Sequence, residues 1–320
     1  MRSYRLVSRS RSLLDILIIV TPVFLVVAAG YAAVWQKVFS DAAVDGLMIF
    51  AQKFAIPCLL FAAMSELDVA AAFDLGVLGA YFISALASFA FAGFGARLLF
   101  GRPVQDCIAI GFAVMFANTL LLGLPVTERA YGPDALDANF SIIAFNAAFC
   151  YFVGITTMEF ARAGVAGVAL IRTVLSAMFR NAIMLSIAAG LSVNFLAMPV
   201  PSVFMDAVNL IGRAALPAAL FGLGGVIYRY KPEGDARTIV FLCLLSLIVQ
   251  PAMSFGLGAL FDLDKEQLRS VVLTAAMAPG ITAYIFSDMY GVARRVIAST
   301  ILFGTALTVV TASFWLAVLP

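Results

Sequence analysis

Apolar stretches of about 20 residues, the length that crosses a bilayer as a helix, recur along this chain and restrict its fold more than any other feature. Seven windows contain no Asp, Glu, Lys or Arg: 75–96, 107–127, 138–158, 181–205, 238–261, 270–287 and 296–320. Three more contain one ionisable residue each: 13–34 with Asp15, 46–65 with Lys53 and 207–228 with Arg213. The pattern predicts an all-α integral membrane protein with ten transmembrane helices.

The composition agrees with a surface that faces hydrocarbon and excludes several classes of function. Hydrophobic residues make up 63% of the chain and charged residues 12%, whereas soluble domains carry about 25% charged residues. The chain has no histidine, which removes Ser-His-Asp catalysis and histidine-based zinc sites. Its four cysteines show no metal-ligand spacing, and no basic run is interleaved with aromatic residues. We therefore expect no enzyme, no cofactor, no metal and no nucleic-acid partner.

The sequence also contains an internal duplication. Three residues of window 46–65 recur 160 positions later: Pro57, Leu60 and Phe61 correspond to Pro217, Leu220 and Phe221. Lys53 and Arg213 keep the same offset, and Tyr131-Gly132 recurs 159 positions later as Tyr290-Gly291. The pattern predicts a first five-helix repeat over 1–160, a connector over 161–180 and a second five-helix repeat over 181–320. Because five is odd, the second repeat enters the membrane from the opposite side, as in many secondary transporters.

The distribution of basic residues predicts the orientation. With the N-terminus outside, the cytoplasmic connections carry eleven Lys and Arg residues and the opposite loops carry three. The N-terminal tail, with Arg2, Arg5, Arg9 and Arg11, favours the reverse orientation. Because the loops agree along the whole chain, we expect the connector 161–180 to be cytoplasmic. We expect the protein itself to lie in a bacterial inner (plasma) membrane.

Two windows at corresponding places in the repeats are interrupted by helix-breaking residues. The segment 118–125 contains Gly123 and Pro125, and the segment 276–282 contains Pro279 and Gly280. Freed backbone groups are tolerated at membrane depth only where protein or a polar cavity satisfies them, so paired interruptions point to a midplane binding site. The alternative is a pair of ordinary proline kinks.

These motifs resemble those of the auxin efflux carriers and their bacterial malonate-transporter-like members. The resemblance is most specific at 118–125 followed by Tyr131-Gly132, and it extends from about residue 20 to the end of the chain. Relatives usually carry glycine where this chain has Leu120. The resemblance implies that the first, second, sixth and seventh helices form a scaffold. The third to fifth and eighth to tenth would then form a mobile transport unit with crossed, broken fourth and ninth helices. It also implies organic anions as substrates.

We expect the substrate to be bound by ten residues at and around this crossover: Lys53, Asn118, Thr119, Gly123, Pro125, Asn146, Tyr151, Pro279, Gly280 and Thr282. Polar residues near Asn146 and Tyr151 reach the crossover in relatives, but interhelical hydrogen bonding explains both residues equally well. Lys53 lies near the middle of its window, where insertion of a lysine costs about 2.5 to 3.5 kcal/mol. It either supplies positive charge to an anion pathway or forms a structural ion pair with Asp15 or another acid.

The function expected from these features is elevator-type secondary transport of small organic anions, such as malonate-like dicarboxylates or other carboxylates. An anion channel is the first alternative. An intramembrane enzyme is the second, and the missing histidine and the missing pair of central aspartates weigh against it. A coupling proton or sodium ion and a homodimer are left open.

Overall fold

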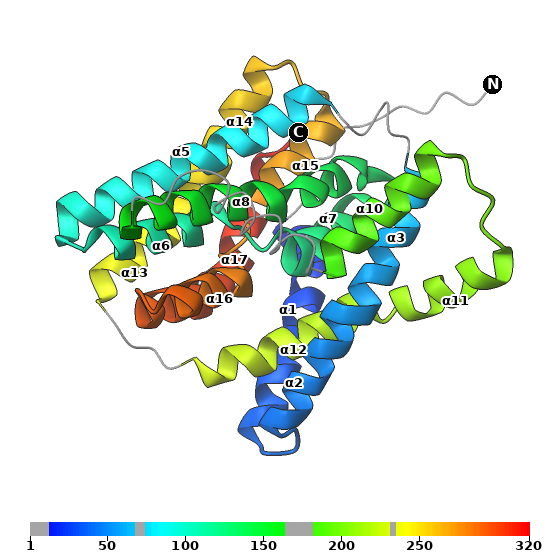
Figure 1. The fold of residues 1–320 in the computed structure, drawn as a ribbon, viewed down its shortest axis with the longest axis horizontal. Coiled ribbons are helices and arrows are strands. Elements are labelled where there is room, and N and C mark those ends of the chain that lie inside the picture. Colours follow the sequence, from blue (N-terminus) through cyan, green and yellow to red (C-terminus); the bar gives the residue numbers. More distant parts are fainter. Residues whose placement is uncertain (1–12, 68–73, 164–181, 231–234) are drawn as a thin grey trace.

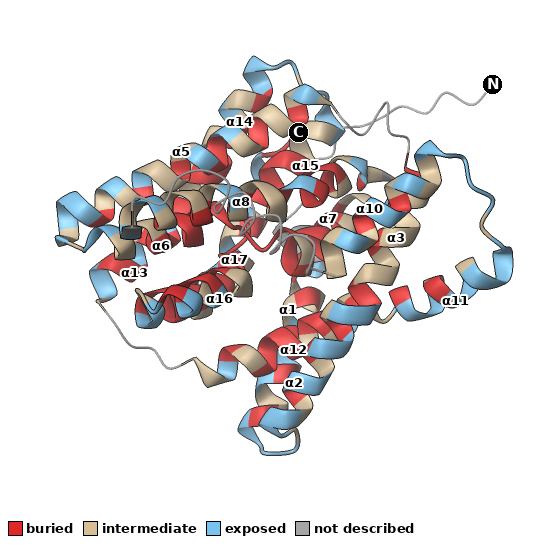
Figure 2. Cartoon of the chain, in the orientation of Figure 1, coloured by how far each residue is buried: buried red, intermediate tan, exposed pale blue. Residues whose placement is uncertain are grey.

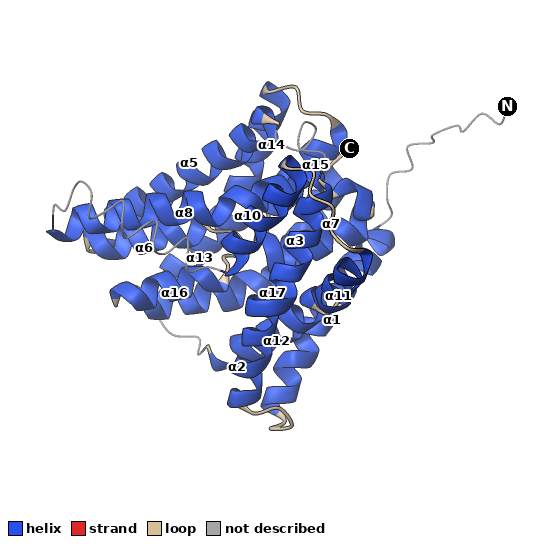
Figure 3. Cartoon of the chain, turned by 45° about the vertical axis from the view of Figure 1, so that its right-hand side comes forward, coloured by secondary structure: helices blue, strands red, loops and turns tan. Residues whose placement is uncertain are grey.

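The described part of the chain, residues 13–67, 74–163, 182–230 and 235–320 of a computed structural model, is almost entirely helical. Its first half forms α1 (Leu13–Trp35), α2 (Asp41–Phe50), α3 (Ile56–Glu66), α5 (Leu75–Phe100), α6 (Val104–Met115), α7 (Leu124–Tyr131) and α8 (Asp137–Ala163). Its second half forms α10 (Ala182–Phe195), α11 (Ser202–Gly212), α12 (Ala215–Arg229), α13 (Ala236–Leu244), α14 (Gln250–Leu260), α15 (Lys265–Ala275), α16 (Ile281–Tyr290) and α17 (Arg294–Val318). These segments contain no strand, which confirms the all-α class (Figure 3). Most of the expected connector 161–180 lies outside the described residues.

Within the described residues, six helices are long and apolar enough to cross a membrane by length and composition. They are Asp41–Glu66, Leu75–Phe100, Asp137–Arg162, Ser202–Arg229, Ala236–Leu260 and Arg294–Val318. Shorter apolar helices cover Val20–Trp35, Val104–Met115 and Ala182–Phe195. The windows expected at 107–127 and 270–287 are each divided into two shorter helices, α6 and α7 in one and α15 and α16 in the other.

The outward surface of the bundle is rich in large apolar side chains. Leu75, Leu98 and Val203 are each at least 80% exposed, whereas Phe112 and Phe286 are fully buried. In Figure 2 the buried residues concentrate where helices meet, and the exposed ones lie along the outer faces and at the tips. Such a surface is stable where its surroundings are hydrocarbon.

The described helices include three wide π turns, and a proline follows every one. Two of the turns lie inside long helices, and the third begins the short helix that ends at Tyr131. The turns span Ala51–Ala55, Thr119–Gly123 and Leu245–Val249. The prolines are Pro57, Pro125 and Pro251, each four residues after the central residue of its turn. A proline lacks the N–H that would bond to the carbonyl four residues earlier, and its ring clashes with that carbonyl. A wider turn moves the carbonyl aside, so at Ala51–Ala55 and Leu245–Val249 the helix continues with a local bulge.

At the junction of α11 and α12 a proline also distorts the helix four residues earlier, and here the helix is broken. The helix is interrupted at Arg213 and Ala214, and Pro217 stands four residues after Arg213. Lys53 and Arg213, which correspond at an offset of 160, therefore both lie where a proline distorts the helix.

Two glycines bring helix backbones into direct contact. A Cβ atom on Gly30 of α1 would lie 1.9 Å from the Phe221 carbonyl oxygen of α12. A Cβ atom on Gly190 of α10 would lie 2.7 Å from the Phe61 carbonyl oxygen of α3. Only glycine permits such backbone contact, and small residues at crossings are a general basis of helix packing in membranes. The two contacts fasten α1 to α12 and α10 to α3.

The helices form two groups in space (Figure 1). Helices α1, α2, α3, α10, α11 and α12 lie together on one side, and α5, α6, α8 and α13–α16 lie on the other. Between them α17 contacts α1, and α7 contacts both α1 and α15.

Candidate functional site

The centre of the bundle contains a crossing of two extended backbone segments. Ala117 and Pro279 form an isolated antiparallel bridge. The Asn118 N–H donates to the Ala278 carbonyl at 2.8 Å, and the Gly280 N–H donates to the Phe116 carbonyl at 2.9 Å. Each interrupted segment thus satisfies backbone groups of the other, as a membrane interior requires. The interruptions meet each other, so they are not two separate kinks.

Helix termini surround this crossing. α6 ends at Met115 and α15 ends at Ala275, while α16 begins at Ile281 directly after the bridge. The N-terminus of α16 therefore points its partial positive charge and its first N–H groups toward the crossing. On the opposite segment the Asn118 side chain accepts a hydrogen bond from the Leu121 N–H at 3.2 Å and caps the π turn.

A cavity of about 450 Å³, here called the crossover cavity, lies against the crossing. Its polar side chains come from the π turn between α2 and α3, from the segment at 118–119, from α8 and from the start of α16: Gln52, Lys53, Asn118, Thr119, Asn146, Tyr151 and Thr282. Apolar residues such as Ile56, Ile143 and Ile281 complete the wall. Binding sites for small molecules commonly have this size and this mixture of apolar walls with a few polar groups.

Asn118 brings an unsatisfied donor to the cavity. Its side chain is 5% exposed, and its Nδ2 has no hydrogen-bond partner among the described residues. The Asn146 Nδ2, on α8, donates to the Thr119 hydroxyl at 3.5 Å. A buried donor without a partner destabilises the protein by about 1 to 3 kcal/mol. A ligand that accepts a hydrogen bond from this donor would therefore bind more tightly.

Lys53 is the one lysine or arginine among the cavity's lining residues. Its side chain is exposed to that space, and no described carboxylate lies within ion-pair distance of it. Asp45, on the same long helix, pairs instead with Arg229 at 2.7 Å. The side chain of Asp15, the other partner considered from the sequence, lies outside the described residues.

Aromatic rings form another part of the wall. The Tyr151 ring lies edge-on to Phe116, with centroids 6.2 Å apart, and 5.9 Å from the ring of Phe112. Phe112 in turn stacks on Phe286 of α16 at 4.0 Å. These contacts fix α8 and α16 around the crossing.

Seven of the ten residues expected at the site line the crossover cavity: Lys53, Asn118, Thr119, Asn146, Tyr151, Gly280 and Thr282. The other three do not. Gly123 closes the π turn by donating its N–H to the Asn118 carbonyl at 3.0 Å, Pro279 pairs with Ala117, and Pro125 lines a different cavity. Gln52 lines the cavity but was not anticipated, although an amide beside an intramembrane lysine is a signal that could have identified it.

Comparisons with known proteins place the chain among transporters. A family model described as "Membrane transport protein" matches residues 15–316. A protein of Rhizobium meliloti (strain 1021) named "Putative malonate transporter" is 24% identical over 305 residues, covering 92% of both chains. "Auxin efflux carrier component 5" of Arabidopsis thaliana is 21% identical over 224 residues, covering 58% of this chain and 63% of that protein. The chain therefore belongs to this family of membrane transport proteins, the family of the auxin efflux carriers, and is a transporter rather than an enzyme.

Proposed function

We propose that this transporter carries small carboxylate anions and that it binds them in the crossover cavity. The observation that carries the proposal is the set of donors gathered there: the unpaired Nδ2 of Asn118, the N-terminus of α16 and the Lys53 ammonium group. A carboxylate accepts hydrogen bonds from all three kinds of group. The name of the Rhizobium relative makes malonate the first substrate to test.

A two-repeat architecture supports alternating access as the mechanism. Gly30 and Gly190 are 160 positions apart, and so are their contacts Phe61 and Phe221. Each glycine meets the phenylalanine of the other repeat, which is what a two-fold relation between inverted repeats produces. We infer ten membrane helices in two inverted repeats, 1–160 and 181–320, joined by the connector 161–180.

The spatial grouping of the helices supports an elevator-type movement. The group of α1, α2, α3 and α10–α12 corresponds to the proposed scaffold, and the group that carries the crossing corresponds to the transport unit. Lys53 belongs to the first group and Asn118 to the second, so the cavity lies between a fixed cation and a movable amide. Sliding of the second group would carry a bound anion away from Lys53. We place this movement in a bacterial inner membrane and leave a coupling ion and a homodimer open to test.

Binding is tested first by heating purified protein with small mono- and dicarboxylates, malonate among them. A ligand that binds the folded state raises its thermal midpoint in proportion to the logarithm of its concentration. Proteoliposomes then test transport: malonate uptake must saturate and must be accelerated by malonate inside the vesicle. Stabilisation by no carboxylate would reject the substrate class, and conductance without counterflow would indicate a channel.

A further inference from the structure

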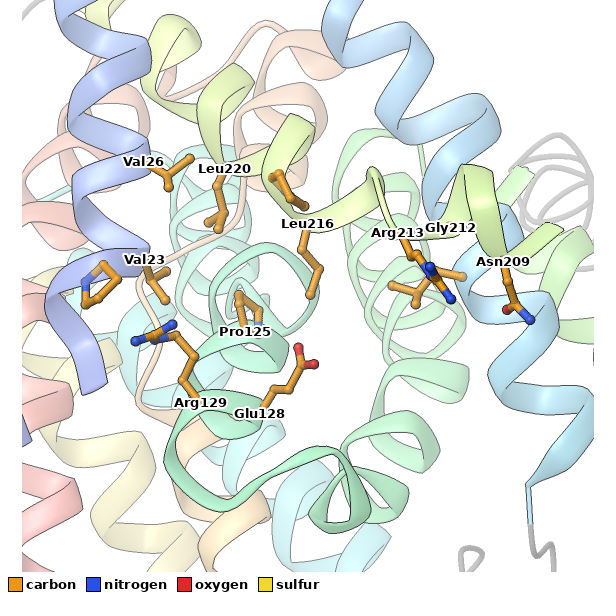
Figure 4. A pocket seen from close by; sticks show the side chains of 13 residues that line it. Val23, Val26, Pro125, Glu128, Arg129, Asn209, Gly212, Arg213, Leu216 and Leu220 are labelled. Carbon is orange, nitrogen blue, oxygen red and sulfur yellow. The ribbon is translucent and has the colours of Figure 1, made fainter. Parts of the chain in front are cut away.

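A second cavity, of about 700 Å³, lies beside α7, the helix that follows the interrupted segment at 118–123. We call it the Arg213 cavity. Its walls come from α1, from α3, from α7 and from the junction of α11 and α12 (Figure 4). It shares no lining residue with the crossover cavity. Along the helical stretch Thr119–Tyr131, Leu121 lines the crossover cavity and Pro125 lines the Arg213 cavity. These two residues are about 6 Å apart along a helix axis.

The Arg213 cavity contains the repeat counterpart of the lysine in the crossover cavity. Lys53 and Arg213 are 160 positions apart, each four residues before a proline and each at a helix distortion. The reciprocal contacts of Gly30 and Gly190 relate the same helices by the same offset. One two-fold relation between the repeats would thus place Lys53 in the crossover cavity and Arg213 in the Arg213 cavity.

Arg213 is available to a ligand. Its side chain is exposed, and none of the ion pairs between described residues includes it. The other charged groups in the wall are Glu128 and Arg129 of α7, so the cavity carries one positive charge in excess. Asn209, one turn before Arg213, adds an amide to the same wall (Figure 4).

We propose that the Arg213 cavity is the anion-binding vestibule of the opposite-facing state, in which Arg213 takes the role that Lys53 has in the crossover cavity. The inference rests on the proposed function. An inverted-repeat transporter reaches its second state by exchanging the conformations of its two repeats, so a cation that serves one state has a counterpart that serves the other. The ligand is the transported carboxylate, held by the guanidinium group of Arg213 and the amide of Asn209.

The test compares malonate transport in membrane vesicles of the two orientations for the wild-type protein, Lys53→Gln and Arg213→Gln. Lys265→Gln is the matched control, because Lys265 is exposed and outside both cavities. Each cavity variant should raise the half-saturating malonate concentration on one side only, and the two variants should differ in the side affected. The expected rise is about tenfold, the usual consequence of losing one charge-assisted hydrogen bond. Arg213→Lys, which keeps the charge, should restore most of the affinity.

A second variant tests the inference without removing the arginine. Asn209→Asp is nearly isosteric and places a carboxylate one turn from Arg213, so it should neutralise the cavity and reproduce the one-sided defect of Arg213→Gln. If Arg213→Gln and Asn209→Asp transport like Lys265→Gln from both sides while Lys53→Gln is impaired, the inference is wrong and the proposed function stands. If the wild-type protein moves no malonate or other small carboxylate, the proposed function itself fails.

Discussion

The indole N–H of Trp315 donates a hydrogen bond of 2.9 Å to the carbonyl oxygen of Leu247. Leu247 is the central residue of the π turn Leu245–Val249, and Pro251 stands four residues after it. The proline removes the α-helical donor to that carbonyl, and the tryptophan of α17 supplies another. A side chain 68 positions away thus makes the distortion in the long helix of α13 and α14 tolerable at membrane depth.

The hydrogen bond from Trp315 predicts a coupling between two substitutions. Trp315→Phe keeps most of the buried ring but leaves the Leu247 carbonyl without this donor, which we expect to cost about 1 to 2 kcal/mol of stability. In a Pro251→Ala background the helix regains its own N–H, so the same change should cost clearly less. Equal costs in both backgrounds, measured by thermal unfolding in detergent, would show that the bond does not compensate for the proline.

The glycine contacts predict a matched pair of defects. Gly30→Ala and Gly190→Ala should both lower the thermal midpoint, because each new methyl group collides with a backbone carbonyl of the neighbouring helix. Gly46→Ala is the control, because nothing lies within 4 Å of a Cβ atom at that position. The change at residue 46 should be neutral or slightly stabilising, because alanine favours the helix over glycine. A defect at Gly30 without one at Gly190 would argue against the proposed two-repeat relation.

Local sequence rules predict the all-α class and seven of the residues that line the candidate site. What they miss depends on contacts between residues that are far apart in the sequence. The prolines and glycines at 118–125 and 276–282 predict where helices stop. A proline acts on the carbonyl four residues earlier, because it lacks the N–H that would bond to this carbonyl and its ring clashes with it. Pro125 shows the limit of that reasoning. It lies in the right segment, but the π turn before it directs Asn118–Leu121 into one cavity and leaves Pro125 in the wall of the other.

Packing between distant helices was beyond the sequence argument in the same way. The offset of 160 residues predicts a repeat, but it does not indicate that Gly30 and Gly190 are contact points between helices. Nor did the apolar window 238–261 indicate that Trp315 would supply a donor to it. These relations depend on which helices become neighbours, and the hydrophobic period of a membrane helix carries little of that information because lipid and protein surroundings are both apolar.

The orientation predicted from basic residues can be measured at two described positions. Gln36, beside Lys37, should lie in the cytoplasm, and Glu266, beside Lys265, should lie on the opposite side. Single cysteines at these two positions, in a background without the four native cysteines, should react with a membrane-impermeant maleimide from opposite sides. Labelling of Glu266→Cys from the cytoplasm would reverse the topology and make the N-terminal arginines the better guide.

Asn118 is expected to separate binding from stability. Its Oδ1 caps the π turn, while its Nδ2 is the unpaired donor in the cavity. Asn118→Asp keeps the capping oxygen but loses the donor and adds a negative charge, so malonate uptake should fall by at least about tenfold with little change in the thermal midpoint. Asn118→Ala should also lose the cap, at about 1 kcal/mol. If Asn118→Asp instead unfolds the protein and leaves the surviving fraction fully active, the residue holds the crossing together and does not bind substrate.

Lys53 provides the sharpest test of electrostatics in the crossover cavity. A lysine near the middle of a membrane helix costs about 2.5 to 3.5 kcal/mol on insertion scales, and no described carboxylate compensates for it. Lys53→Gln should therefore leave the protein equally stable or more stable while malonate uptake falls sharply. Lys53→Arg should retain most uptake, because it keeps the charge and the donors. The thermal midpoint and the initial rate of uptake are measured on the same preparations. A structural ion pair would give the reverse pattern, with a large loss of stability and normal transport by the protein that remains folded.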